Sequence, residues 1–377
     1  MLVLKNKVVT IKLMKSKKFI FGVMSGTSLD GIDVVLIKVA NNKIKLISFQ
    51  HKPYPSALAN GLLFAQKPSH NDLEVSIELG LLHAEITASI INNMLRKLNI
   101  DAKDICCIGY HGQTIRHQPI KKFSIQIGSA HMLAEKTRIT VVADFRNRDI
   151  VAGGQGAPLV PAFHQQVFSS ATKNRIIINI GGISNITYLK INHKLIGFDC
   201  GPGNLLLDYW IKKNKNKNYD NQGKWARTGN IIPKLLTEFM KEPFFQKKLP
   251  KSTGRDLFNS SWLENFNYKN ERPEDIQRTL LELTALSISM AINKYCNEVD
   301  EIFICGGGSK NLFLKNRLEQ ITSQIVSDTE VLGIPSESVE AVAFGWLANE
   351  SINSAPNNSP EITGSSGKRI LGVIHPA

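Results

Sequence analysis

Three turns rich in glycine and small polar residues each follow an apolar, strand-like run of this sequence. They lie at Gly26, Gly181 and Gly306. Glycine at such a place either lets the backbone turn or lets a ligand approach the backbone closely. Hydroxyls and free N–H groups beside it can hold an anion. A nucleotide explains three such turns best, with two turns on its phosphates and one against its adenosine.

The first turn lies between the strand-like runs 19–23 and 33–38, and taken alone it also fits an ordinary hairpin. The same pattern of strand, polar turn and strand returns at 175–189, about half the chain later. Two such hairpins predict a duplicated two-domain fold with a cleft between the copies. The residues that we predict to bind the nucleotide are Gly26, Thr27, Ser28, Leu29, Asp30, Gly31, Ile32, Asp33, Asn179, Gly181, Gly182, Gly306, Gly307 and Gly308.

The rest of the chain alternates strand and helix patterns, which favours an α/β fold. Helices are predicted at 56–65, 71–98, 130–137, 232–240, 273–295, 312–320 and 338–353. A buried strand from Ile105 is expected to end in a polar loop near His111, and ligands of open α/β sheets bind where strands end. Residues 151–161 are rich in glycine and proline and predict a hinge. The predicted domains are therefore 18–150 completed by 344–377, and 151–343, after an extension 1–17.

Composition excludes some classes of function. The chain of 377 residues has a net charge of +14, but its lysines are scattered among asparagines without interleaved aromatic residues, so nucleic-acid binding is not expected. No apolar run approaches the roughly 18 residues that span a bilayer. The five cysteines show no C-x-x-C spacing, which favours a reducing compartment and predicts neither zinc nor disulfides. We expect a cytoplasmic protein, with Met14 as an alternative start.

Paired glycine-rich hairpins of this kind resemble those of the actin, hexokinase and Hsp70 superfamily, whose ribonuclease H-like domains close on ATP. Six segments narrow the match further: VMSGTSLDGID (23–33), YHGQTIRH (110–117), VADFR (142–146), GGQGAPLVP (153–161), NIGGISN (179–185) and DCGPGN (199–204). Through these segments the sequence is similar to the anhydro-N-acetylmuramic acid kinase family, from about Lys18 to the C-terminus.

That resemblance implies a coupled reaction. Water opens the internal 1,6-anhydro bond of a peptidoglycan-derived amino sugar at C1, and O6 takes the γ-phosphate of ATP. It also implies that Asp199, a lone acid at a strand end, is the base, with Glu340 as a second carboxylate that orients the water. The alternatives are that Asp199 caps the helix that begins near Asn204, and that Glu340 only complements its helix dipole.

The substrate implied by the resemblance carries a lactyl carboxylate. The guanidinium group of an arginine can bind such a carboxylate through two parallel hydrogen bonds. Arg146 and Arg148 are the candidates, unless they form ion pairs with Asp144 or Asp149. Further contacts to the sugar, or structural hydrogen bonds, are expected from His111, Gln113 and His164. ATP is expected to bind together with a divalent metal ion, Mg²⁺. Either Asp30 or Asp33 could be a ligand of this ion, and the sequence does not decide between them. A homodimer is a further expectation.

Three other functions remain to be distinguished. A plain sugar kinase would phosphorylate a free hydroxyl and add no water to its product. An ATP-driven switch of the chaperone or actin type would need a peptide-binding domain or polymer contacts. We expect no spare length for a peptide-binding domain. Binding to nucleic acid would show as retention on a polyanion at physiological salt.

Overall fold

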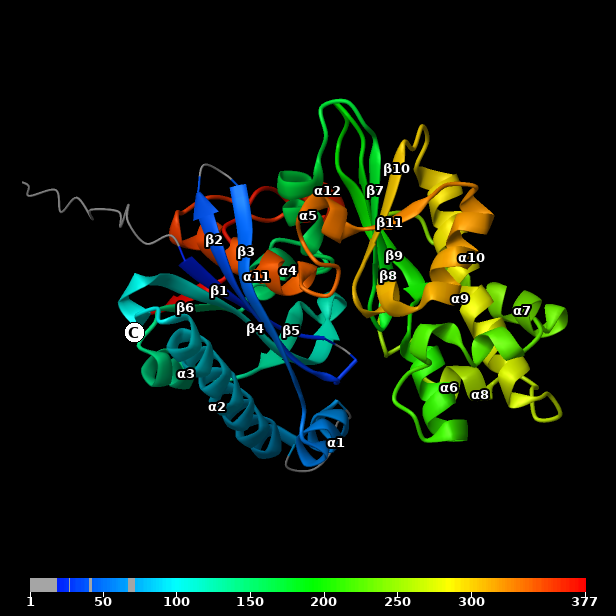
Figure 1. Cartoon of the computed structure of the whole chain (residues 1–377), viewed down its shortest axis with the longest axis horizontal. Coiled ribbons are helices and arrows are strands. Elements are labelled where there is room, and N and C mark those ends of the chain that lie inside the picture. Colours follow the sequence, from blue (N-terminus) through cyan, green and yellow to red (C-terminus); the bar gives the residue numbers. More distant parts are fainter. Residues whose placement is uncertain (1–18, 27, 41–42, 67–71) are drawn as a thin grey trace, which may run out of the picture.

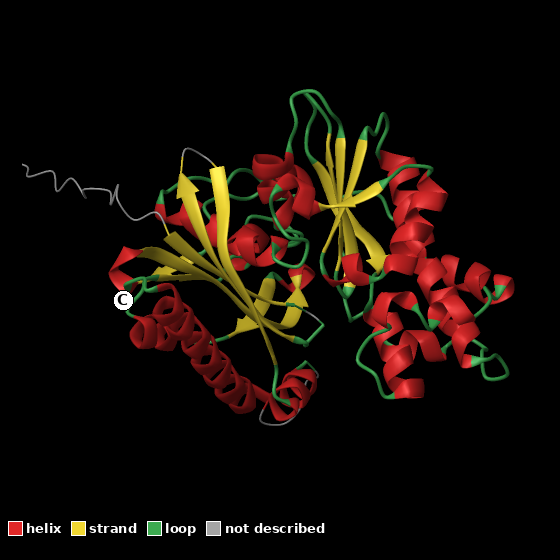
Figure 2. Cartoon of the chain, in the orientation of Figure 1, coloured by secondary structure: helices red, strands yellow, loops and turns green. Residues whose placement is uncertain are grey.

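Two mixed β-sheets lie side by side, each with its own helices (Figure 1). The computed structural model describes residues 19–26, 28–40, 43–66 and 72–377. The predicted Thr27 and the extension 1–17 lie outside the described residues. Figure 2 shows that helices flank both sheets, which is the α/β class expected from the sequence.

The first sheet has the strand order β12-β6-β4-β1-β2-β3, and one further strand, β5, pairs with β4. β1 runs antiparallel to β2 and parallel to β4. The strands are β1 (Phe19–Ser25), β2 (Gly31–Ala40), β3 (Lys43–Pro53), β4 (Ile105–Gln118), β5 (Phe123–Ile127), β6 (Val141–Ala143) and β12 (Val373–His375).

The second sheet, β11-β10-β7-β8-β9, repeats the order of β6-β4-β1-β2-β3 and has no counterpart of β12. Its first strand, β7, again runs antiparallel to the next strand and parallel to its other neighbour, β10. The strands are β7 (Arg175–Ile180), β8 (Ile183–Leu189), β9 (Ile196–Pro202), β10 (Glu301–Cys305) and β11 (Val326–Asp328). The duplicated, ribonuclease H-like architecture predicted from the two hairpins is therefore confirmed.

Helices cover both sheets. In Figure 1, α2 and α3 lie below the first sheet, and α9 and α10 lie on the outer side of the second. The helices are α1 (Ser56–Ala65), α2 (Asp72–Leu98), α3 (Ala130–Thr137), α4 (Asn147–Val151), α5 (Val160–Phe168), α6 (Leu205–Lys215), α7 (Pro233–Met240), α8 (Ser260–Glu264), α9 (Pro273–Tyr295), α10 (Leu312–Thr322), α11 (Val339–Ile352) and α12 (Pro360–Thr363).

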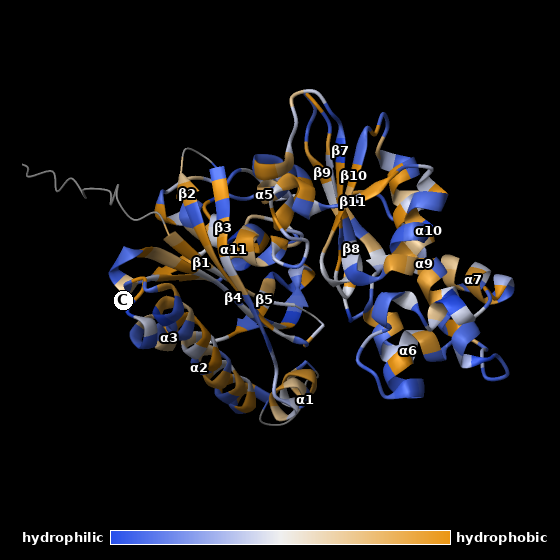
Figure 3. Cartoon of the chain, in the orientation of Figure 1, coloured by the Kyte–Doolittle hydropathy of each residue, from blue (hydrophilic) through white to orange (hydrophobic). Residues whose placement is uncertain are grey.

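One buried apolar cluster joins the two halves. It contains Ile20 and Phe344 of the first half, Ile177 of β7 and Phe163 of α5. Figure 3 shows the matching pattern, with apolar residues along the central strands and mixed faces on the outer helices. α11 packs against β1 and β4, so the chain returns to the first sheet after building the second. The predicted boundary at residue 344 falls inside this helix.

The structure differs from the sequence-based expectation at two strands. β4 does not end in a loop near His111 but continues to Gln118, because its second part pairs with β5 while a positive φ of 68° at Gly112 bends the strand. The short strand β11 was not predicted, since three residues carry too little pattern. None of the helices in the described part of the chain is long and apolar enough to cross a membrane.

Candidate active site

A row of side chains crosses the second sheet near the ends of its strands. Cys305, Asn179, Asn185 and Asp199 are direct partners on β10, β7, β8 and β9. Directly paired residues point to the same face of a sheet. That face is turned toward the first half, because Asn179 Nδ2 donates a hydrogen bond to Glu340 Oε1 of α11, at 3.3 Å.

Asp199 is 7% exposed, and its Oδ2 accepts a hydrogen bond from the backbone N–H of Thr253 at 2.9 Å. Burial raises the pKa of this carboxyl to about 7, against the opposing effects of the Thr253 hydrogen bond and the charges of Arg146 and Lys251. A carboxylate with a pKa near neutrality suits a general base. The alternative role as a helix cap is wrong, since Asn204 is the N-cap residue of α6.

Glu340 lies in the first turn of α11 and faces the same region. Burial raises its pKa, and the charges of Asp33 and Asp30 act in the same direction. Its hydrogen bond from Asn179 and the charge of Arg146 oppose this rise. Charged and polar groups of both halves therefore surround Glu340. A glutamate that only complements the dipole of its helix would not need these neighbours.

Arg146 completes this group from the first half. Its Nε and Nη2 lie 3.2 and 2.9 Å from His111 Nε2, and its Nη1 donates to the carbonyl of Gly156 at 2.8 Å. Burial lowers the pKa of Arg146 to about 10, while Glu340 and Asp199 raise it. The guanidinium therefore stays charged beside the two carboxyl groups.

His111 is held in one neutral form by these contacts. Its Nδ1 lies 2.6 Å from the carbonyl of Gly112, so Nδ1 carries the hydrogen and Nε2 accepts from Arg146. Burial holds the pKa of His111 well below its usual range, and the charge of Arg146 adds to this. The histidine thus supports the orientation of Arg146.

Ion pairs of Arg146 or Arg148 with Asp144 or Asp149, which were the alternative to binding a carboxylate, are not found among the described residues. Asp149 instead accepts hydrogen bonds from the Gly156 backbone, Thr363 and Asn358. Arg148 is exposed on α4.

Gln113 and His164 each form hydrogen bonds with other residues of the protein. Gln113 is buried, donates from Nε2 to the Gly26 carbonyl at 3.0 Å, and accepts at Oε1 from Tyr54. His164 is buried in α5 with Nδ1 2.9 Å from Thr187 Oγ1, and burial lowers its pKa to about 3. These contacts are the structural hydrogen bonds that were the alternative to sugar binding.

The first hairpin turn faces a loop of the second half. Within the turn, Ser28 Oγ donates to Asp30 Oδ1 at 2.8 Å. Arg255 reaches across and donates to the Ser28 carbonyl at 3.5 Å. Asp33, at the start of β2, lies 2.7 Å from His51 Nδ1, and burial raises its pKa. The turn is thereby bounded by charges of both signs.

A buried chain of hydrogen bonds fixes the strand end before this turn. Ser25 Oγ donates to the Gly112 carbonyl at 2.8 Å, so it accepts from His83 Nε2 at 3.0 Å. His83 Nδ1 then accepts from Tyr110 Oη at 2.6 Å. Burial lowers the pKa of His83 to about 3, which agrees with this neutral form. Sequence reasoning missed His83 because it reads as an ordinary residue of a long helix.

The second turn is held by the segment before α6, and the strand before it contacts the third turn. The carbonyl of Gly181 accepts from the N–H of Asn204, and that of Gly182 accepts from Gly203 and Leu205. Gly306 has a φ of 79°, and a side chain there would overlap Asn179. By contrast, the space next to Gly26, Gly181 and Gly307 is open enough for a side-chain carbon, and hence for an approaching ligand.

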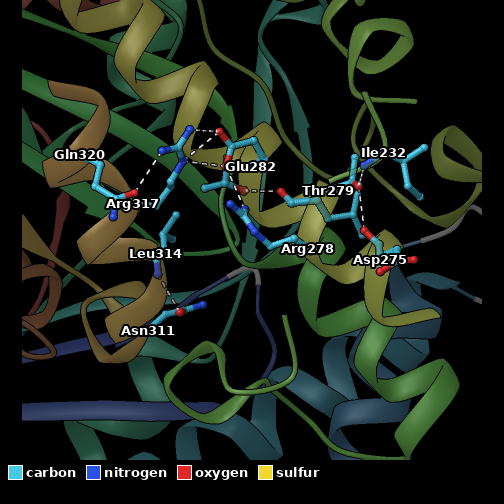
Figure 4. Close-up of polar contacts among 11 residues, drawn as sticks. Ile232, Asp275, Arg278, Thr279, Glu282, Asn311, Leu314, Arg317 and Gln320 are labelled. Carbon is cyan, nitrogen blue, oxygen red and sulfur yellow. Dashed lines mark hydrogen bonds and ion pairs between the residues drawn. The ribbon is translucent and has the colours of Figure 1, made fainter. Parts of the chain in front are cut away.

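The helix after the third turn is anchored by a buried ionic network (Figure 4). Glu282 of α9 is 2% exposed and accepts from Arg317 through both Nε and Nη2, and from Arg278 at 2.9 Å. Asn311 caps α10 by accepting from the N–H of Leu314 at 3.1 Å. These contacts fix the base of the glycine turn to α9.

The described residues contain no cluster of three or more histidine, cysteine or acidic side chains that would hold a metal by itself. Asp30 and Asp33 do offer carboxylate oxygens next to the first turn, and these are the ligands that Mg²⁺ prefers. They fit a metal that takes its remaining ligands from nucleotide phosphates and water.

The family of the chain follows from a match over nearly its full length. The model of the anhydro-N-acetylmuramic acid kinase family matches residues 18–377. The chain belongs to this family. A relative of that name in Nitrosospira multiformis is 44% identical over 367 residues, covering 97% of this chain and all of the relative. Another, from Nitrosomonas europaea, is 45% identical over 359 residues, covering 94% of this chain and 99% of the relative.

Solved structures are much more distant. An activator of 2-hydroxyisocaproyl-CoA dehydratase from Clostridium difficile, with bound ADPNP, is 12% identical, with a TM-score of 0.44 over 90% of this chain and 99% of that one.

Proposed function

We propose that this protein is an ATP-dependent kinase of peptidoglycan recycling. It opens the 1,6-anhydro ring of 1,6-anhydro-N-acetylmuramic acid and phosphorylates O6, which gives N-acetylmuramic acid 6-phosphate and ADP. The observation that carries this proposal is the meeting of Asp199, Glu340 and Arg146 beside the glycine turns, in a chain of this family.

The reaction joins a hydrolysis and a phosphoryl transfer. A water oxygen bonds to C1 while one of its protons moves to Asp199, and the C1–O6 bond breaks with its electron pair on O6. O6 then bonds to the γ-phosphorus of ATP, and ADP leaves. Because the phosphoryl group captures O6, no separate acid is needed there, unlike in an inverting glycosidase.

Asp199 is suited to this role because its Oδ2 is fixed by the Thr253 backbone and its pKa of about 7 allows it both to take and to release a proton at neutral pH. Glu340 and Asp199 would together confine the attacking water. The charge of Arg146 favours the ionised form of both carboxyl groups. With Arg148, it would also supply the fork for the lactyl carboxylate.

ATP binds to the three glycine turns in this proposal, with its phosphates at Gly26 to Ser28 and at Gly181 and its adenosine at Gly306 to Gly308. Mg²⁺ would be held by Asp30 or Asp33 and would neutralise phosphate charge. The two predicted domains close on both substrates. A cytoplasmic location and a homodimer remain predictions.

A plain sugar kinase is the second candidate, because Asp199 next to a phosphate site would equally activate a free hydroxyl. An assay with the anhydro sugar, ATP and Mg²⁺ separates the two. The proposal expects one phosphate and one opened ring per ATP. A phosphorylated sugar whose anhydro ring is intact would refute it.

A further inference from the structure

A small cavity lies between β9 and α9, next to the strand that carries Asp199. Its volume is about 40 Å³, and its lining contains two lysines, Lys251 and Lys294, and no acidic residue. One water needs roughly 10–15 Å³ on this scale, so the cavity has room for about three waters. A small tetrahedral oxyanion also fits, because its oxygens share one central atom and lie closer together than separate waters.

Lys251 is buried in the wall of this cavity without a partner of opposite charge. It is 8% exposed, and its ammonium group has no ion pair or hydrogen bond in the described part of the chain. Its Nζ lies 4.6 Å from the ring centre of Phe244 and 5.6 Å from that of Phe198. A ring face attracts a cation but does not satisfy the three N–H groups of an ammonium. Because lysines are rarely buried unless they are paired, Lys251 indicates a binding site for an anion.

Lys294 of α9 lines the same cavity from its exposed side. It also lacks an acidic partner among residues 19–26, 28–40, 43–66 and 72–377. Burial lowers the pKa of Lys251, the nearby thiol of Cys200 opposes this, and the like charge of Lys294 acts in the same direction as burial. An anion with several charged oxygens would bind both ammonium groups and remove their mutual repulsion.

Lys251 is also connected to Asp199. β9 is the last strand of its sheet, and on its free edge the N–H of Asp199 donates to the Lys251 carbonyl at 3.3 Å. Burial raises the pKa of Asp199, and the charge of Lys251 opposes this rise. An anion bound to Lys251 would offset that charge, so the pKa of Asp199 would rise further.

We propose that the cavity between β9 and α9 binds one inorganic phosphate ion through Lys251 and Lys294, and that bound phosphate hinders Asp199 as a base. The binding does not depend on the reaction, whereas the effect on activity rests on the proposed function. Free phosphate fits the volume of the cavity, but the ester of a sugar does not. The protein would therefore work more slowly when free phosphate is abundant.

Calorimetric titration of inorganic phosphate into the full-length protein tests the binding. A non-hydrolysable ATP analogue and Mg²⁺ are present, so that the glycine turns are occupied. One phosphate should bind per chain, and Lys251→Met and Lys294→Met should each weaken it by about tenfold or more, because each removes a charge-assisted contact. Lys294 is exposed, so its variant should fold like the wild type.

Lys248→Met is the matched control. It removes the same charge from an exposed lysine that does not line the cavity, so it should bind phosphate like the wild type. Glucose 6-phosphate should not displace the phosphate, since its sugar does not fit. Absence of binding, equal binding by all of these proteins, or displacement by the sugar phosphate would overturn the inference.

The pH dependence of kcat/KM for the sugar tests the connection to Asp199. At saturating ATP and constant ionic strength, phosphate in place of chloride should move the acid limb to higher pH in the wild type and in Lys248→Met, but not in Lys294→Met. Lys251→Met should have its limb at higher pH with or without phosphate. Arg146, which acts on Asp199 from the first half, is the same in all of these proteins.

Two results would separate the claims. An acid limb that stays in place while phosphate binds to the wild type would overturn the connection to Asp199. An intact anhydro ring in the wild-type product would instead overturn the proposed function and leave the calorimetric result unchanged.

Discussion

Gly22 of β1 and Ala341 of α11 are in direct backbone contact, because any side-chain carbon on Gly22 would overlap the carbonyl oxygen of Ala341. Gly345, one turn later on the helix, lies against Gly22 as well. Glu340 immediately precedes Ala341, so this contact sets how far the carboxyl group of Glu340 projects toward Asn179 and Arg146. The position of a proposed catalytic side chain thus depends on a glycine that never touches a substrate.

Gly22→Ala should separate α11 from β1. The added methyl group overlaps backbone atoms that cannot move alone, so we expect a loss of about 1–3 kcal/mol in unfolding free energy, as for overpacked cores, and loss of activity. Gly26→Ala is the matched control, because the space beside Gly26 is open: it should unfold like the wild type but bind ATP more weakly. Equal stability of Gly22→Ala and the wild type in urea would contradict this packing.

The pH dependence of kcat/KM should show an acid limb near pH 7. Asp199 acts as a base only when ionised, and burial raises its pKa to about 7, so the rate should fall about tenfold per pH unit below that value. Arg146→Gln removes a charge that lowers this pKa and should move the limb to higher pH. Arg148→Gln should weaken sugar binding without moving the pH at which kcat/KM begins to fall. If kcat/KM stayed constant down to pH 5, Asp199 would not be the base.

Asp199→Asn should be inactive yet more stable than the wild type at pH 8. The folded protein keeps the Asp199 proton up to about pH 7, while the unfolded chain releases it near the usual value of 3.8, so the wild type loses stability as the pH rises between these values. Asparagine avoids this cost, which is at most about 4 kcal/mol. Thermal melts at pH 8 and pH 4 check this, and a gain of equal size at both would contradict the ionisation argument.

Glu282→Gln should destabilise the second half by up to about 3 kcal/mol, since Glu282 is buried and pairs with Arg278 and Arg317, whose side chains are 11% and 27% exposed. Glu238→Gln is the control, because its ion pair with Lys241 is exposed and should be worth less than about 1 kcal/mol. Urea unfolding measures both. Similar losses in the two variants would show that burial does not decide the effect.

Local patterns predicted much of this fold. The helices Ser56–Ala65, Ala130–Thr137 and Pro273–Tyr295 match the sequence analysis residue for residue, because each has a clear apolar period. The three glycine turns were also identified correctly as turns after strands. The second hairpin predicted the duplication of the fold, whereas the strand order within the two sheets was not predicted.

Parts of the site depend on contacts that no local pattern contains. The pairing of Asn185 with Asp199 is a matter of strand register, and the contact of Arg146 with His111 joins residues 35 positions apart. Arg255 was not among the predicted site residues, although its loop, 250–256, has residue types that suit a phosphate. His164, a predicted sugar contact, lies in the core with Thr187, since a histidine in a short helix carries no sign of which side it faces.

The most direct test of the central claim is the reaction run in ¹⁸O-labelled water with the anhydro sugar, ATP and Mg²⁺, followed by mass spectrometry of the product. The account predicts one ¹⁸O atom at C1 and an unlabelled phosphate on O6 for every ATP consumed, and no product with Asp199→Asn. A phosphorylated sugar without the label at C1 would contradict it.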